Sequence, residues 1–199
     1  PLINWFEDLS FQKKILKMQE LTKAINNHLA CEFQASHIYL AMSIWLREKD
    51  LAGFSSYMQT KSQEERGHAD RLIAYLVDCD EQVELPSVDA PQRSWTSTQK
   101  LFDQIYEMEQ AVTASINRIY SIAEQAGERS ATAMLDWFIA EQLQEEAEAR
   151  FVRKRLRLAG DNSAALLLLD QQFLDGTALS TVKGSPAGLH QTGMKKDAG

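Results

Sequence analysis

The sequence predicts an all-α protein, a four-helix bundle with a long crossover between its second and third helices and a short fifth helix. Three observations support this fold. The chain of 199 residues contains only four prolines. The stretches between them are rich in Ala, Leu, Glu, Gln, Arg and Met, which favour helices. With 44% hydrophobic residues, the chain is also apolar enough to bury a core.

The helices are placed by their hydrophobic periodicity and by their end signals, at residues 16–47, 51–78, 96–126, 129–159 and 163–175. Thr96 and Gln99 predict a capping box at the start of the third helix. Ser163 is the expected cap of the fifth helix. Gly127 and Gly160 are expected to end the third and fourth helices, because glycine adopts the backbone conformation found there at low cost.

The connections predict how the helices pair. Short links follow the first and third helices, so each is expected to pack antiparallel to its successor. The link CDEQVELPSVDAPQRSW, by contrast, is long enough to return the chain across the whole bundle. The expected organisation is an N-terminal extension at residues 1–15, the bundle domain at 16–176 and a flexible C-terminal tail at 177–199.

Charge and composition limit the classes of partner. The formal net charge of −7 argues against nucleic acid and anionic membranes and is compatible with cations. Cys31 and Cys79 are too few for a disulfide framework and are expected to be reduced thiols. There is no secretory signal pattern and no apolar run long enough for a membrane span. We expect a cytoplasmic protein, or a plastid protein if a transit segment was removed.

The positions expected to face the bundle interior contain acidic residues. Steps of four and three along the second helix select an apolar stripe that includes Lys61, Glu65 and His68. The same steps place one glutamate in the stripe of every long helix: Glu32, Glu65, Glu109 and Glu145. Two further polar residues, Tyr39 and Gln142, lie on these stripes.

Four buried carboxylates need a compensating charge. Removing an unpaired carboxylate from water costs several kcal/mol, whereas a domain is stable by only about 5–15 kcal/mol. Protonation and lysine or arginine partners are two solutions, but Lys61 is the only basic residue on the stripes apart from His68. A pair of divalent cations is the third solution, and it uses carboxylate and imidazole groups as ligands. We favour this one.

The spacing of these residues supports a di-metal centre. Glu32 and Glu65 are 33 positions apart, and so are Glu109 and Gln142. His68 lies three residues after Glu65, and Glu145 lies three residues after Gln142. Each motif alone is typical of an ordinary solvated helix face, but the repeated offset is hard to obtain by chance. Di-metal carboxylate bundles use this arrangement, and an oxygen-rich ligand set favours iron over zinc, with manganese also possible.

Residues 18–175 resemble the ferritins, specifically the non-haem bacterial and algal kind. The resemblance is carried by the motifs CEFQASHIYLA, QEERGHADRL, MEQAVTASI and FIAEQLQEE. It implies a ferritin-like bundle that assembles into a cage of 24 subunits. It also implies iron storage with ferroxidase activity, in which Fe(II) is oxidised by O2 or H2O2. The alternatives are a di-iron or di-manganese oxidase or catalase without storage, and a helical bundle that binds no iron.

The resemblance also assigns roles to residues. It places Glu32, Glu65 and His68 at a first iron site, with Glu65 as the bridging ligand. The second site is implied at Glu109 and Glu145, with Gln142 nearby. Tyr39 matches the tyrosine that ferritins place beside the iron pair, where it binds a ligand carboxylate through a hydrogen bond or supplies an electron.

Some positions depart from the patterns of related families. Glu64 and Glu141 match a third iron site, but Gln144 stands where that site usually has a carboxylate, so the site is weakened or absent. Bacterioferritins have a haem-binding methionine where this chain has Arg66 and a histidine ligand where it has Glu145. The expected cofactor is therefore a di-iron pair without haem.

Overall fold

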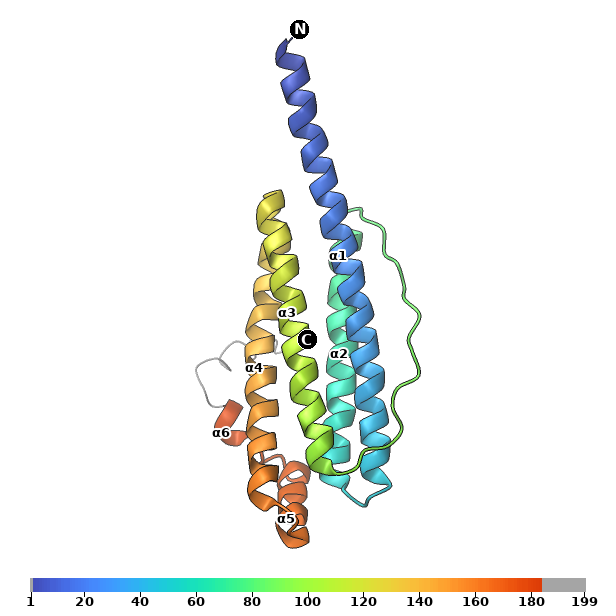
Figure 1. Cartoon of the computed structure of the whole chain (residues 1–199), viewed down its shortest axis with the longest axis vertical. Coiled ribbons are helices and arrows are strands. Elements are labelled where there is room, and N and C mark those ends of the chain that lie inside the picture. The colour runs from blue at the N-terminus through green and yellow to red at the C-terminus, as the bar shows by residue number, and fades with distance from the viewer. Residues whose placement is uncertain (1, 184–199) are drawn as a thin grey trace, which may run out of the picture.

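A computed structural model describes the backbone of residues 2–183 and the side chains of residues 12–180 and 182. It confirms the all-α fold, a four-helix bundle followed by a short fifth helix (Figure 1). The helices are α1 (Leu2–Arg47), α2 (Ala52–Asp78), α3 (Thr98–Ala126), α4 (Arg129–Ala159), α5 (Ser163–Leu174) and α6 (Ser180–Lys183). None of the helices in this described part combines the length and apolar character that a membrane span needs.

The two ends of the chain differ from the sequence-based boundaries. Helix α1 begins at Leu2 instead of residue 16, and its first turns project beyond the other three long helices (Figure 1). After α5, Ala178 and Leu179 are only 3% and 7% exposed, so the first residues of the predicted tail join the core. The rest of that predicted tail, residues 184–199, lies outside the described residues.

Two predicted helix caps are displaced by one residue. Ser97, not Thr96, caps α3, because its extended backbone directs its hydroxyl towards the backbone N–H three residues later. Asn162, not Ser163, caps α5 and accepts two backbone hydrogen bonds at 3.0 and 3.1 Å. The glycines predicted to end α3 and α4 both do so with positive φ, at 72° and 54°.

Small serines bring α1 and α2 close together. The hydroxyl of Ser36 donates to the carbonyl of Ser62 at 2.8 Å. Seven residues further along each helix, Ser43 and Ser55 each donate to the other's backbone carbonyl, at 2.8 and 2.9 Å. These buried bonds fix the register of the helix pair that carries Glu32 and Glu65.

The crossover between α2 and α3 is attached along α1. The side chain of Asn26 donates to the carbonyl of Gln82 at 2.9 Å and accepts from the N–H of Glu84 at 2.8 Å. Two turns later, the amide of Gln34 makes the same pair of bonds with the backbone of Asp89. The crossover therefore follows α1 down the outside of the bundle, as Figure 1 shows.

Helix α5 is joined to the start of α2 by a buried carboxylate. Leu51 occupies the N-cap position of α2 and makes no side-chain capping bond. Asp170 of α5 takes over this function and accepts from the N–H groups of Gly53 and Phe54 at 3.1 and 2.7 Å. The close contact requires a glycine, because a Cβ at Gly53 would lie 1.9 Å from the carbonyl oxygen of Asp170.

The apolar core is divided into two clusters. One contains Leu21, Leu72 and Phe138, and the other contains Met42, Phe54 and Phe102. The side chains of the predicted site belong to the same four helices that form these clusters. Polar groups in a setting this apolar must find partners within the protein or bind a ligand.

Candidate metal centre

The structure buries the polar residues predicted to face the interior. The exposed fraction is 0% for Glu32 and 3% each for Glu65, Glu109 and Glu145, and the neighbouring polar side chains are also buried: Tyr39, His68 and Gln142. The helical periodicity of the sequence therefore identifies the inward faces of all four long helices correctly.

Glu32, Glu65 and His68 form a cluster with the geometry of a metal site. One ligand atom from each side chain can be chosen so that all three lie within 4.8 Å of one another. Nδ1 of His68 is 3.2 Å from a carboxylate oxygen of Glu65 and 3.7 Å from one of Glu32. Two carboxylates and an imidazole form a ligand set suited to Fe(II), Mn(II) or Zn(II).

Neither oxygen of Glu32 has a hydrogen-bond partner among the described residues, although the side chain is fully buried. Nε2 of His28 approaches one of them to 2.9 Å, but this contact is an ion pair and lacks the geometry of a hydrogen bond. A buried carboxylate in this condition is costly unless a cation is close. His28 and His68 supply positive charge when protonated, and the same carboxylate oxygens are available to a metal ion that takes the place of these protons.

Metal binding at this cluster is coupled to the release of a proton. Burial by itself lowers the pKa of His68, but Glu32 and Glu65 raise it to about 11. Burial likewise opposes charge on Glu32, yet His28 and His68 hold its pKa below the usual value. Burial raises the pKa of Glu65 well above the usual value. Because metal ligands must be deprotonated, binding here displaces the proton of His68.

Glu109 is held by neighbouring side chains. The hydroxyl of Tyr39 donates a short hydrogen bond to Oε1 of Glu109. The amide of Gln142 donates to the other carboxylate oxygen and to the backbone carbonyl of Glu109, both at 3.2 Å. Burial, with the added charge of Glu109, raises the pKa of Tyr39 well above 10, so the phenol remains protonated as a donor. Both oxygens of Glu109 thus have protein partners.

Glu145 is paired with a buried lysine. Nζ of Lys61 lies 2.6 and 2.7 Å from the two oxygens of Glu145, and Lys61 is only 5% exposed. Burial lowers the pKa of Lys61, but Glu145 and its neighbours raise it well above the usual value. Burial raises the pKa of Glu145 to about 7 against the opposing effect of Lys61. The structure therefore contains the lysine partner that the sequence analysis considered as an alternative to metal.

The residues of the predicted third site are less closely associated with one another than Glu32, Glu65 and His68 are. Glu64 is half-buried and lies 2.9 Å from Nζ of Lys61. Glu141 is half-buried and has no hydrogen bond or ion pair with the other predicted ligands in the described part of the chain. Gln144 is buried and donates to Glu148 at 2.9 Å.

Two buried residues of this region are absent from the predicted set. His28 lies one turn before Glu32, and its Nδ1 is 3.0 Å from the hydroxyl of Ser115. Glu148 is 2% exposed and accepts a hydrogen bond from Tyr57 at 3.1 Å. The spacing could have indicated both, because His28 lies four residues before Glu32 and Glu148 lies three after Glu145.

Comparison with known proteins supports one family. A model of the ferritin-like domain matches residues 22–159. The bacterial non-heme ferritin of Campylobacter jejuni is 34% identical over 83% of this chain and 98% of its own length. That of Bacteroides fragilis is 28% identical over 78% and 96%. An open pore ferritin from the archaeon Archaeoglobus fulgidus superposes with a TM-score of 0.76 and 32% identity, covering 77% of this chain and 94% of its own.

The match spans all four long helices and the residues that form the buried polar cluster. It agrees with the bundle architecture, the long crossover and the short fifth helix of the structure. The chain belongs to the ferritin family.

Proposed function

We propose that the protein is an iron-storage ferritin with ferroxidase activity. It oxidises Fe(II) to Fe(III) at a di-iron centre inside each subunit and mineralises the product within a cage of 24 copies. The observation that carries the proposal is the buried Glu32 carboxylate, whose oxygens have no hydrogen-bond partner among the described residues, beside Glu65 and His68. The matches to bacterial non-heme ferritins support iron as the metal.

In this mechanism the helices supply ligands from both halves of the chain. Glu32 and His68 bind the first Fe(II), and Glu65 bridges to the second, which Glu109 and Glu145 bind. Carboxylates suit this chemistry because their negative charge stabilises the Fe(III) product. Each Fe(II) gives one electron, so a pair reduces dioxygen with two protons to hydrogen peroxide. With hydrogen peroxide as oxidant, the pair and two protons yield two water molecules.

Tyr39 and Gln142 position Glu109. Gln142 donates to both the carboxylate and the backbone of Glu109, which limits rotation of that side chain. Tyr39 donates to the other oxygen. Its second proposed role, as a buried phenol, is to supply an electron to the iron pair. Glu64 and Glu141 are proposed as ligands of a weaker third site, since Gln144 replaces a carboxylate there.

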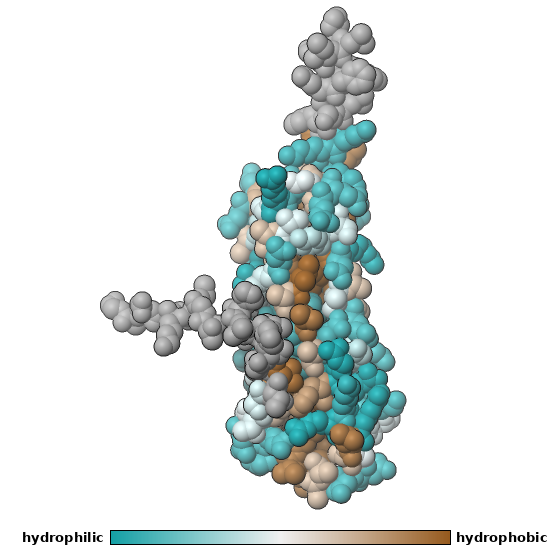
Figure 2. Space-filling view, turned by 90° about the vertical axis from the view of Figure 1, so that its left-hand side faces the viewer, coloured by the Kyte–Doolittle hydropathy of each residue, from teal (hydrophilic) through white to brown (hydrophobic). Residues whose placement is uncertain are grey.

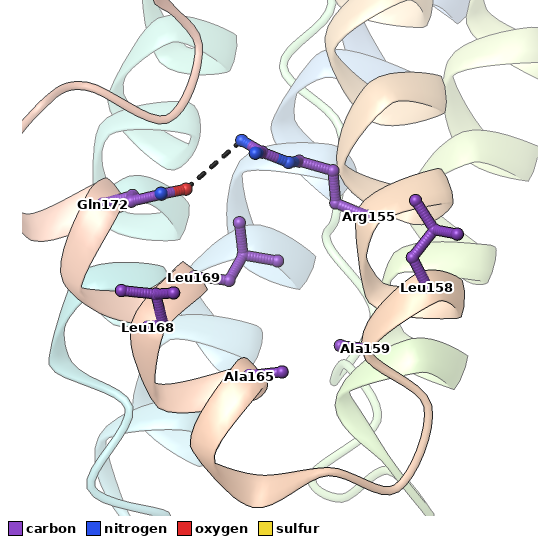
Figure 3. Close-up of a pocket in the computed structure, with 7 residues that line it drawn as sticks. All are labelled: Arg155, Leu158, Ala159, Ala165, Leu168, Leu169 and Gln172. Carbon is purple, nitrogen blue, oxygen red and sulfur yellow. Dashed lines mark hydrogen bonds between the residues drawn. The ribbon is translucent and has the colours of Figure 1, made fainter.

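Exposed leucines support assembly into a cage. Leu158 of α4 is 88% exposed, and Leu167 and Leu168 of α5 are 57% and 63% exposed. Figure 3 shows Ala165 and Leu169 of α5 facing α4 across a hollow of about 280 Å³, which the Arg155–Gln172 hydrogen bond spans. Hydrophobic residues also appear at this end of the bundle in Figure 2. Contiguous apolar surface of this kind marks contacts between protein copies.

The test combines assembly with iron oxidation. Size-exclusion chromatography first determines whether the protein forms a cage. Anaerobic Fe(II) loading followed by oxygen then measures the oxidation rate in the wild type, in Glu65→Ala and in the matched control Glu107→Ala, which removes an exposed carboxylate from α3. We expect Glu65→Ala to lose rapid oxidation and Glu107→Ala to retain it.

Two outcomes contradict the proposal. Unchanged oxidation kinetics in Glu65→Ala would reject the site, and a metal-containing monomer that turns over peroxide or an organic substrate would favour an oxidase or catalase. Crystals loaded with Fe(II) under argon and then exposed to oxygen show site occupancy and assembly together.

A further inference from the structure

The two halves of the proposed iron centre differ in how their carboxylates are satisfied. In the first half, neither oxygen of Glu32 has a hydrogen-bond partner within the described residues. In the second half, both oxygens of Glu109 accept hydrogen bonds, from Tyr39 and Gln142. Both oxygens of Glu145 likewise accept from Lys61. Glu32 faces the imidazoles of His28, at 2.9 Å, and His68, at 3.7 Å, without a hydrogen bond, whereas protein donors already occupy the ligand atoms of the second half.

Lys61 lies among charged groups from two helices. Its Nζ is closest to Glu145 of α4, at 2.6 Å, and is 3.4 Å from Glu148 of the same helix. From its own helix, Glu64 approaches to 2.9 Å and the ring of Tyr57 to 5.6 Å. Lys61 thus contacts three carboxylates while almost fully buried, which stabilises the ammonium in place of a metal ion.

The ammonium also stands at an opening to the surface. Lys61, Glu64 and Tyr57 line a hollow of about 240 Å³ formed by α2 and the segment after α5, including Leu179. Glu64 and Lys61 line this hollow, and Nζ of Lys61 is bonded to Glu145, which is not one of the lining residues. The positive charge of Lys61 therefore opposes the approach of a second cation to Glu145, whose two oxygens the ammonium already occupies.

We propose that Lys61 is an internal counter-ion that makes the two metal positions unequal. The Glu32–Glu65–His68 position binds a divalent cation first and tightly, and the Glu109–Glu145 position fills only when Lys61 leaves Glu145. This inference rests on the proposed iron centre and adds a residue that determines the order and stoichiometry of metal binding. Nothing in the proposed ligand set requires a lysine at this position.

Zinc-soaked crystals test the inference without any redox chemistry. Crystals of the assembled wild type, Lys61→Gln and the matched control Lys23→Gln are soaked in rising Zn²⁺ concentrations, and anomalous diffraction gives the occupancy of both positions. Lys23 is an exposed residue of α1, so the control removes one positive charge outside the centre.

In the wild type and the control, we expect the first position to reach half-occupancy at a Zn²⁺ concentration about 10- to 100-fold lower than the second, within the usual range of coupling between neighbouring sites. In Lys61→Gln, the second position should fill at nearly the same concentration as the first. Nζ of Lys61 should leave Glu145 in doubly loaded wild-type crystals.

The outcomes separate this inference from the proposed function. Equal filling of both positions in the wild type, or an unchanged second position in Lys61→Gln, overturns the role of Lys61 but leaves the iron centre intact. Absence of zinc from both positions in every protein overturns both. If Lys61→Gln does not fold, the wild-type order of filling and the position of Nζ decide the question.

Discussion

Asp170 is predicted to be a principal link between α5 and the bundle. Its carboxylate is 7% exposed and accepts from the N–H groups of Gly53 and Phe54, at the N-terminus of α2. Replacing Asp170 with alanine leaves both donors without an acceptor, because the N-cap residue of α2 is Leu51, which makes no capping bond. The perturbation is therefore confined to a single junction between two helices.

The magnitude follows from these two bonds. A hydrogen bond to a charged group contributes about 1.5–3 kcal/mol, and loss of a helix N-cap residue costs about 0.5–2 kcal/mol. Water reaches the first turn once it opens, so we expect a combined loss of about 3 kcal/mol in the free energy of local opening. Since about 1.4 kcal/mol corresponds to a factor of ten, amide exchange in this turn should accelerate by about 100-fold.

Hydrogen exchange measured by mass spectrometry on the assembled protein tests this number. The informative peptide is the one that covers the first turns of α2. Asp175→Ala is the matched control, because Asp175 is an exposed aspartate that follows α5 and whose side chain, among the described residues, bonds only to Gln171. Exchange in Asp170→Ala that equals the wild type, or an equal acceleration in both variants, would refute the reasoning.

Two further predictions concern individual hydrogen bonds. Tyr39→Phe removes the donor to Oε1 of buried Glu109, so calorimetry of the metal-free protein should show a loss of about 1–2 kcal/mol in stability; an unchanged unfolding temperature would contradict this role. Asp103 accepts from Arg153 at 2.6 Å, and although burial opposes its charge, this arginine lowers the pKa of Asp103. The pKa of Asp103 is lower in the folded protein than in the unfolded chain, where it is about 3.9. The charged carboxylate therefore stabilises the fold at pH values above about 3.9, and this contribution is lost as the pH falls through the folded pKa. Asp103→Asn should therefore be less stable than the wild type by about 1 kcal/mol at pH 7. Thermal unfolding measured at decreasing pH should show this difference disappear. A difference in stability that persists at low pH would count against the ion pair.

Helical periodicity determined much of the candidate site. A helix turns by the same angle at every residue, so the sequence alone shows that Glu32, Glu65, Glu109 and Glu145 share the inward faces. The short and long links likewise determined which helices are paired and where the chain crosses over. These features depend only on local geometry and on the position of apolar residues.

The partners of the buried groups depended on the tertiary structure. Lys61 lies on a predicted inward face, but its long side chain has many rotamers, and only the packing of α4 against α2 directs its ammonium to Glu145. Asp170 and Gly53 are 117 positions apart, and no local pattern relates them. The sequence by itself determined which side chains enter the interior. Only the folded chain decided how their charges are paired, because hydrogen bonds between helices depend on distances that no repeat in the sequence encodes.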